Sequence, residues 1–232
     1  MDKYTAVVLA AGAGSRMHSK TKKQYLMLKG KPVLYYSLAA FEKHPGIGEI
    51  ILVCGEEDIS WCRQEIVVKF AFQKIKKIIP GGRERYHSVY EGLKAAGSCD
   101  WVLIHDGARP VLDQEILDRV LAALPRYRAC VAAVPVKDTI KRGDSQGFVT
   151  ETLPREELWT IQTPQAFSYR EILDAYEKLM EQKETQVKIT DDAMVAEYIH
   201  GTKVKLIEGS YKNIKITTPE DMELAAVYLR EI

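Results

Sequence analysis

The sequence predicts an α/β fold: a single Rossmann-like domain with a mostly parallel sheet flanked by helices, plus a protruding β-hairpin arm. Short apolar runs recur between segments of helical periodicity, which is typical of alternating strands and helices. These runs are 7–9, 50–53, 75–79, 102–104 and 131–134. The first, Val7-Val8-Leu9, is continuously apolar, as expected of a strand buried on both faces of a parallel sheet. No internal repeat or Gly/Ser-rich linker divides the chain, so one domain is expected.

Three helices can be located from their ends and their apolar faces. The first begins near Pro32, which suits a first helical turn, and runs to about Lys43. The second covers 84–96 and ends at Gly97; its apolar stripe is Tyr86, Val89, Tyr90 and Leu93. The last opens with Thr218-Pro219-Glu220-Asp221, a cap residue and an acidic first turn; its stripe is Met222, Ala225, Ala226 and Leu229.

The stretch 137–158 breaks this alternation. It is polar, charged and rich in turn residues, with Arg142-Gly143-Asp144-Ser145-Gln146-Gly147 between two short β-like runs. This pattern predicts a hairpin that leaves the domain. An isolated two-stranded hairpin is marginally stable in water, so we expect the arm to pack against a partner subunit.

Composition limits the possible partners. The chain has 232 residues, 46% hydrophobic and 28% charged, and a formal net charge of +1. A near-neutral chain argues against a general nucleic-acid or membrane surface, so any anion site should be a local pocket. The four cysteines, Cys54, Cys62, Cys99 and Cys130, form no C-x-x-C pair, which favours a reducing compartment. With no apolar leader at the amino terminus and no membrane span, a cytoplasmic protein is expected.

A glycine loop, residues 10–16, follows the first apolar run. Gly12 and Gly14 permit a positive φ and a close approach to a ligand, exposed amides can donate to phosphate oxygens, and Arg16 adds a positive charge. A dinucleotide fingerprint would need a third glycine where Met17 stands, and no Walker Gly-Lys-Ser/Thr follows. An ordinary strand-to-helix turn remains the alternative for this segment alone.

Other polar residues also follow predicted strands, where ligands of such sheets bind. Asp106 comes directly after 102–104 and offers a hard oxygen ligand for Mg²⁺ beside a triphosphate; a turn-capping Asp before Gly107 is the alternative. Arg109 either pairs with Asp106 or helps to order the site.

The pair Gly81-Gly82 after the third run suits main-chain recognition of a base edge, or a plain turn. Ser88 could add a hydroxyl, although an exposed helix position is the more ordinary explanation. We assign no catalytic role to His87 or His105, because a histidine in such positions is more often a core residue.

A series of motifs runs along nearly the whole chain. The motifs are Leu-Ala-Ala-Gly-x-Gly-x-Arg-Met, Lys23-Gln24-Tyr25, Gly81-Gly82 with Arg85 and Ser88, His105-Asp106-Gly107-Ala108-Arg109-Pro110, Pro135-Val136-Lys137-Asp138-Thr139, Gln162-Thr163-Pro164-Gln165-Ala166-Phe167, Thr190-Asp191-Asp192-Ala193 and Asn213-Ile214-Lys215. In the order and spacing of these motifs the chain resembles the 2-C-methyl-D-erythritol 4-phosphate cytidylyltransferase family.

The resemblance implies a homodimeric nucleotidyltransferase domain, residues 1–232, that uses CTP, Mg²⁺ and methylerythritol phosphate in the non-mevalonate isoprenoid pathway. It further implies that the arm, 137–158, serves dimerisation and substrate binding. The implied nucleotide-binding residues are Ala10, Ala11, Gly12, Gly14, Gly81, Gly82, Ser88 and Gly107. By the same resemblance Arg16 and Lys23 stabilise the reacting phosphate and Asp106 ligates the metal. The expected acceptor-binding residues are Arg109, Thr139, Arg155, Thr163 and Lys215.

Two positions depart from the family pattern. Leu9 stands where many members have Pro, and Tyr211-Lys212 precedes Asn213 where some members offer a carboxylate. The first change is conservative, whereas the second leaves the completeness of the metal shell open.

The expected chemistry needs no general base. A phosphate monoester has a second pKa near 6, so at neutral pH it is largely dianionic and can attack the α-phosphorus of CTP directly. The site must supply alignment and charge neutralisation, which makes Lys20 and Lys22 bystanders. Two alternatives remain. One is ribitol 5-phosphate cytidylyltransferase, which Asp138-Thr139-Ile140-Lys141-Arg142 and Leu158-Trp159 disfavour; the other is a catalytically idle nucleotide-binding relative, which the retained Arg16, Lys23 and Asp106 disfavour.

Overall fold

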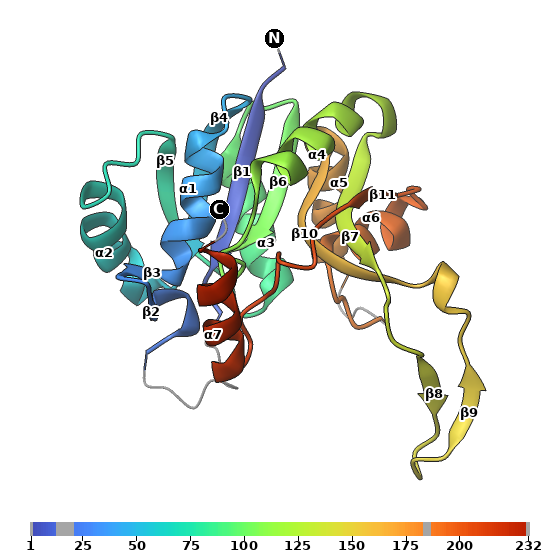
Figure 1. The fold of residues 1–232 in the computed structure, drawn as a ribbon. Helices are drawn as coiled ribbons and strands as arrows, with labels where there is room; N and C mark the ends of the chain where they lie inside the picture. Colours follow the sequence, from blue (N-terminus) through green and yellow to red (C-terminus); the bar gives the residue numbers. More distant parts are fainter. Residues whose placement is uncertain (1, 13–20, 183–186, 231–232) are drawn as a thin grey trace.

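A seven-stranded sheet forms the centre of the protein (Figure 1). The computed structural model describes residues 2–12, 21–182 and 187–230. The strand order is β11-β7-β10-β6-β1-β4-β5. The strands are β1 (Tyr4–Ala10), β4 (Ile47–Cys54), β5 (Ile75–Pro80), β6 (Trp101–Asp106), β7 (Ala129–Pro135), β10 (Trp159–Ser168) and β11 (Lys205–Glu208). Strand β10 runs antiparallel to β6 and β7, and the other pairings are parallel, which confirms a mostly parallel sheet.

Helices cover both faces of this sheet. One face carries α1 (Val33–Lys43) and α4 (Gln114–Tyr127), and the other carries α3 (Arg85–Ala96), α5 (Tyr169–Glu181) and α6 (Asp192–His200). Alternate residues of β1 explain the two cores: Ala6 and Val8 pack in the first layer, and Val7 packs in the second. The continuous apolar run therefore serves two cores at once, as the sequence predicts.

Shorter elements complete the fold. They are η2 (Lys23–Tyr25), β2 (Met27–Leu28), β3 (Lys31–Pro32), η3 (Glu56–Asp58), α2 (Ile59–Trp61), η4 (Cys62–Val68) and η5 (Arg155–Glu157). The last helix, α7 (Pro219–Tyr228), shares a small third cluster with α1 and β2, which includes Leu28, Val33 and Ile216. Among the described residues no helix is both long and apolar enough to cross a membrane.

The three predicted helices are confirmed. Pro32 is the N-cap of α1, one residue before the helix, and Gly97 ends α3 with a φ of 68°. Thr218 and Asp221 form a reciprocal capping box at the start of α7. The sequence analysis did not locate α4, α5, α6, β10 or β11. Strand β10 is the important omission, because it inserts between β6 and β7 and carries Thr163 to the site.

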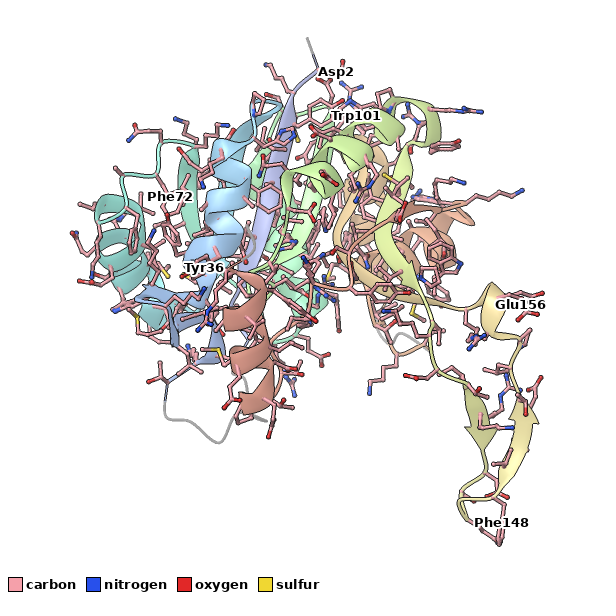
Figure 2. The ribbon with its side chains drawn as sticks, viewed as in Figure 1. Asp2, Tyr36, Phe72, Trp101, Phe148 and Glu156 are labelled. Atoms are coloured by element: carbon pink, nitrogen blue, oxygen red, sulfur yellow. The ribbon has the colours of Figure 1, made fainter. Side chains whose placement is uncertain are left out.

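The predicted hairpin arm is confirmed as β8 (Lys141–Gly143) and β9 (Val149–Thr152), joined by a turn. The Asp144 carboxylate accepts hydrogen bonds from the backbone N–H groups of Gln146 and Phe148 at 2.9 Å, which closes the turn. Figure 2 shows Phe148 at the far tip of the arm, well away from the sheet. Its side chain is exposed, so the arm has no hydrophobic core of its own.

Candidate active site

A cavity of about 310 Å³ opens at the carboxyl ends of β1 and β6. Its lining combines the described part of the glycine loop with the residues that follow β5 and β6: Leu9, Ala10, Ala11, Gly12, Lys23, Gln24, Gly82, Arg83, Glu84, Arg85, Ser88, Asp106, Ala108 and Lys215. The sequence analysis predicts that the glycine loop and Asp106 face one ligand, and the structure brings them to the same cavity. Gly14 and Arg16 lie outside the described residues.

Hydrogen bonds between β1, β6 and η2 hold residues 10–12, the described part of the glycine loop. Leu9 is in register with Asp106, and the N–H of Gly107 donates to the carbonyl of Leu9 at 2.8 Å. The buried amide of Gln24 donates to the carbonyls of Ala10 at 2.6 Å and Gly12 at 3.1 Å. The sequence places Gln24 in a motif but does not predict this role, because the role depends on a contact between η2 and the residues that follow β1.

Glycine is required at two positions by close packing. A Cβ at Gly81 would lie 2.5 Å from the Cβ of Ala11, and a Cβ at Gly107 would lie 2.8 Å from the carbonyl oxygen of Leu9. Gly12 differs from the expectation: its φ lies outside the left-handed region, and a Cβ there would meet none of the described residues within 4 Å. Its backbone borders the cavity and is not forced into a special conformation.

Ser88 shapes the turn that carries Gly82. Its hydroxyl accepts a hydrogen bond from the N–H of Gly82 at 3.1 Å and donates to the carbonyl of Glu84 at 3.2 Å. The side chain is buried yet borders the cavity. The exposed-helix alternative for Ser88 is therefore wrong, and a direct contact with a nucleotide stays a prediction.

Asp106 is surrounded by cations. Its Oδ2 lies 2.9 Å from Lys215 Nζ and 3.8 Å from Arg109 Nε, and its Oδ1 lies 3.3 Å from Arg85 Nε. Burial alone would raise the pKa of this carboxyl, but Arg85, Lys215 and Arg109 together hold the pKa well below its usual range. Asp106 is consequently an anion throughout the physiological pH range.

Thr163 fixes the backbone at Asp106 from the neighbouring strand β10. Its hydroxyl accepts a hydrogen bond from the N–H of Asp106 at 3.1 Å and lies 2.9 Å from Nδ1 of His105. His105 is fully buried, with its other ring nitrogen 3.4 Å from the carbonyl of Arg109. The interpretation of His105 as a core residue is confirmed.

Burial lowers the pKa of His105 to about 4. In the unfolded chain the pKa of a histidine is about 6.5, so between about pH 6.5 and pH 4 the unfolded chain binds a proton at His105 that the folded protein does not. The free energy of unfolding should therefore fall as the pH falls through this range. We expect a loss of about 2 kcal/mol between pH 7 and pH 5 from this residue, measurable by urea unfolding. His105→Gln should flatten that slope. Equal slopes in wild type and His105→Gln would contradict the assignment.

The other predicted acceptor-binding residues lie in three settings. Lys215 lines the cavity. Arg109 is buried behind Asp106, with its guanidinium donating to the carbonyl of Asn213 at 2.7 Å. Thr139 and Arg155 lie on the arm: Thr139 is exposed, and Arg155 donates to the carbonyl of Lys137 at 2.9 Å. Neither arm residue borders the cavity of its own chain, so their role as acceptor ligands stays a prediction.

The residues present fit a magnesium ion that arrives with a nucleotide. Mg²⁺ is commonly held by one or two carboxylates, with substrate phosphates and water as the remaining ligands. Asp106 is ionised and borders the cavity, which meets that requirement. Over 2–12, 21–182 and 187–230, no cluster of three or more His, Cys, Asp or Glu side chains could form a cage alone.

A cationic cavity with glycine edges, at the carboxyl ends of a mainly parallel sheet, defines an α/β protein of the nucleotide-binding class. The model of the 2-C-methyl-D-erythritol 4-phosphate cytidylyltransferase family matches residues 4–231. The chain belongs to this family.

Relatives and solved structures agree over the full length. The 2-C-methyl-D-erythritol 4-phosphate cytidylyltransferase of Lachnospira eligens is 50% identical over 97% of this chain and 99% of the relative, and that of Clostridium kluyveri is 49% identical over 95% and 94%. The crystal structure of 4-diphosphocytidyl-2C-methyl-D-erythritol synthase from Anaerococcus prevotii is similar with a TM-score of 0.86 and 34% identity, covering 99% of this chain and 96% of that one. The Thermus thermophilus cytidylyltransferase gives a TM-score of 0.74 at 28% identity, covering 97% and 98%.

Proposed function

We propose that this protein transfers CMP from CTP to 2-C-methyl-D-erythritol 4-phosphate in non-mevalonate isoprenoid biosynthesis, with release of pyrophosphate. The product is 4-diphosphocytidyl-2-C-methyl-D-erythritol. The observation that carries the proposal is the convergence of Ala10, Gly12, Lys23, Asp106 and Lys215 on one cavity. Full-length membership of the cytidylyltransferase family supports the choice of nucleotide and acceptor.

The reaction is a displacement at phosphorus. An oxygen of the acceptor phosphate dianion forms a bond to the α-phosphorus of CTP, and the bond from that phosphorus to the α,β-bridging oxygen breaks, so pyrophosphate leaves with the electron pair. Because the nucleophile is already ionised, His105 is not needed as a base. The protein aligns two anions and stabilises the charge that develops between them.

The predicted site residues have the following parts in this scheme. Lys23 and Arg16 stabilise the transferring phosphoryl group and the leaving pyrophosphate, and the amides of residues 10–12 bind phosphate oxygens. Gly81, Gly82, Ser88 and Gly107 bind the nucleoside, while Lys215, Arg109 and Thr163 orient the acceptor. Magnesium held by Asp106 would neutralise charge on the triphosphate. The whole chain acts as one nucleotidyltransferase domain, in the cytoplasm, without nucleic-acid or membrane partners.

Acceptor choice tests the proposal. Purified protein with CTP and Mg²⁺ should release pyrophosphate with methylerythritol phosphate and scarcely at all with ribitol 5-phosphate. A coupled pyrophosphate assay with each acceptor at equal concentration makes this measurement. The opposite ranking would assign the protein to the ribitol 5-phosphate cytidylyltransferases. No pyrophosphate release with either acceptor, in a protein that still binds CTP, would favour a catalytically idle nucleotide-binding relative.

The arm is proposed to complete the acceptor site of a second copy in a homodimer, through Thr139 and Arg155. Arg155→Ala subunits and Asp106→Asn subunits should each be nearly inactive alone. In a heterodimer, the intact core of one subunit meets the intact arm of the other, so about half of the sites should recover. The pyrophosphate assay on verified heterodimers measures this, and no recovery would mean that Arg155 acts within its own chain.

A further inference from the structure

Asp192 is a buried acid that the proposed chemistry does not use. It is the first residue of α6, and none of its surface is exposed. Both of its carboxylate oxygens face Arg85: Nη1 donates to Oδ1 at 2.9 Å and Nη2 donates to Oδ2 at 2.8 Å. Such a bidentate contact fixes the plane of the guanidinium as well as its position. Arg85 is therefore oriented by a residue outside the cavity.

The same guanidinium also reaches the site. Its third donor, Nε, points to Oδ1 of Asp106 at 3.3 Å, and Arg85 itself lines the cavity. One N–H of each Nη group is directed at Asp192, and the contact that Arg85 makes with Asp106 comes from Nε. Lys215 supplies the closest contact to the other oxygen of Asp106. Each oxygen of Asp106 therefore accepts from a single close donor. This holds Asp106 less strongly than a bidentate contact with Arg85 would.

Two further elements hold Asp192 in this place. The hydroxyl of Tyr176, on α5, donates to Oδ1 of Asp192 at 2.6 Å. The side-chain oxygen of Gln165, on β10, accepts hydrogen bonds from the backbone N–H groups of Asp192 and Ala193, both at 2.9 Å. Helices α3, α5 and α6 and strand β10 therefore converge on one ion pair that ends at the cavity.

We propose that Asp192 is a positioning residue for the nucleotide–metal site: by occupying both Nη groups of Arg85, it keeps that guanidinium from closing on Asp106. The inference rests on the proposed function, because it assigns Asp106 to the metal that accompanies CTP. Without the Asp192 charge, Arg85 is free to turn its Nη groups toward Asp106, the other carboxylate that it already contacts. A bidentate ion pair between Arg85 and Asp106 would compete with the divalent cation for the same carboxylate oxygens.

A double-mutant cycle on direct CTP binding tests this role. Calorimetry with CTP and Mg²⁺ should show that Asp192→Asn raises the Kd about tenfold or more, while binding of CTP in EDTA changes less than about threefold. In an Arg85→Gln background the competing guanidinium is absent, so Asp192→Asn should then change the Kd by less than about twofold. Equal weakening in both backgrounds, or a wild-type Kd for folded Asp192→Asn, would overturn the proposal.

Asp191→Asn is the matched control. Asp191 precedes Asp192 and caps α6 by accepting from the N–H of Met194 at 3.0 Å, a role that Asn also fills. Its other carboxylate oxygen accepts from the side-chain amide of Gln165 at 2.9 Å, and it forms no hydrogen bond with Arg85. The Asp191→Asn variant should therefore bind CTP with Mg²⁺ with a Kd within about twofold of wild type; a tenfold rise would point to a general charge effect and overturn the specific role.

Tyr176→Phe provides a second variant should Asp192→Asn not fold. It removes the hydroxyl that holds Oδ1 of Asp192 at 2.6 Å and so loosens the contact between Asp192 and Arg85; a Kd for CTP at least threefold higher with Mg²⁺, and unchanged in EDTA, is expected. A wild-type Kd with Mg²⁺ would contradict the positioning role. Because these are binding measurements, they remain informative even if the acceptor assay identifies a different acceptor, which would contradict the proposed function alone.

Discussion

Replacing Asp106 by Asn should lower kcat by about three orders of magnitude, because the change removes the carboxylate that is proposed to hold Mg²⁺ beside the triphosphate. Asn is nearly isosteric, so the shape of the cavity is kept while the charge that faces Lys215, Arg85 and Arg109 is lost. Steady-state pyrophosphate release at saturating CTP and acceptor measures the effect. A folded Asp106→Asn protein with wild-type kcat would remove Asp106 from the chemistry.

The same variant should also be less stable. Removing one partner from a buried ionic network leaves uncompensated charges, which costs about 3 kcal/mol. Because the pKa of Asp106 is held far below its unfolded value, its contribution to stability is present above about pH 4 and is lost as pH falls further toward the folded pKa. Urea unfolding at pH 7 should therefore separate wild type from Asp106→Asn, and the difference should shrink in strong acid.

Asp113→Asn controls for loss of an acidic side chain as such. Asp113 caps α4 by accepting from the N–H of Ile116 at 2.8 Å, and Asn is an equally good cap. Both its kcat and its free energy of unfolding should stay close to wild type.

The part of the site that the sequence predicts best is the part whose signal is local. Two short apolar runs each predict a buried strand that ends at a site residue. They are Val7-Val8-Leu9, followed by Gly12, and Val102-Leu103-Ile104, followed by Asp106. Parallel strands place such ends at one edge of a sheet, so convergence follows from the fold class alone. The structure bears this out through the Leu9–Asp106 register.

Strand β10 shows where the local signal fails. Pro164 lies inside it, and proline normally argues against an interior strand because it lacks an N–H donor. Pairing with β7 is interrupted between Ile161 and Gln165, which accommodates the proline. Strand β10 can therefore be recognised only once its neighbouring strands are known. The same is true of the hydrogen bond by which Thr163 fixes the backbone of Asp106.

The supporting polar network was equally hidden. Arg85 and Asp192 are 107 residues apart in sequence, and Gln24 reaches back to Ala10 from another element. Each residue type has an ordinary exposed role in most proteins, so composition and spacing give no reason to bury it. The motifs of the family resemblance include these residues, but tertiary packing, in which buried polar groups find partners, is what shows how they pair.

Lys23→Ala should lower kcat by at least about a hundredfold, the expected cost of removing a cation that stabilises charge on the transferring phosphoryl group. Lys23 begins η2 and borders the cavity, next to Gln24, which ties η2 to the glycine loop. Because its charge matters most in the transition state, kcat should fall more than the KM for CTP rises. Arg16→Ala should have a comparable effect, by its place in the glycine loop sequence.

Lys22 is the control that makes this prediction specific. It carries the same charge one residue earlier, but its ammonium pairs with Glu57 and lies 2.6 Å from Asp58, and it does not border the cavity. Lys22→Ala should therefore change kcat by less than about threefold, since a partly exposed pair contributes little beyond local stability. If both variants lost activity equally, the loss would reflect disruption of η2 as a whole, and the distinct catalytic role of Lys23 would be excluded.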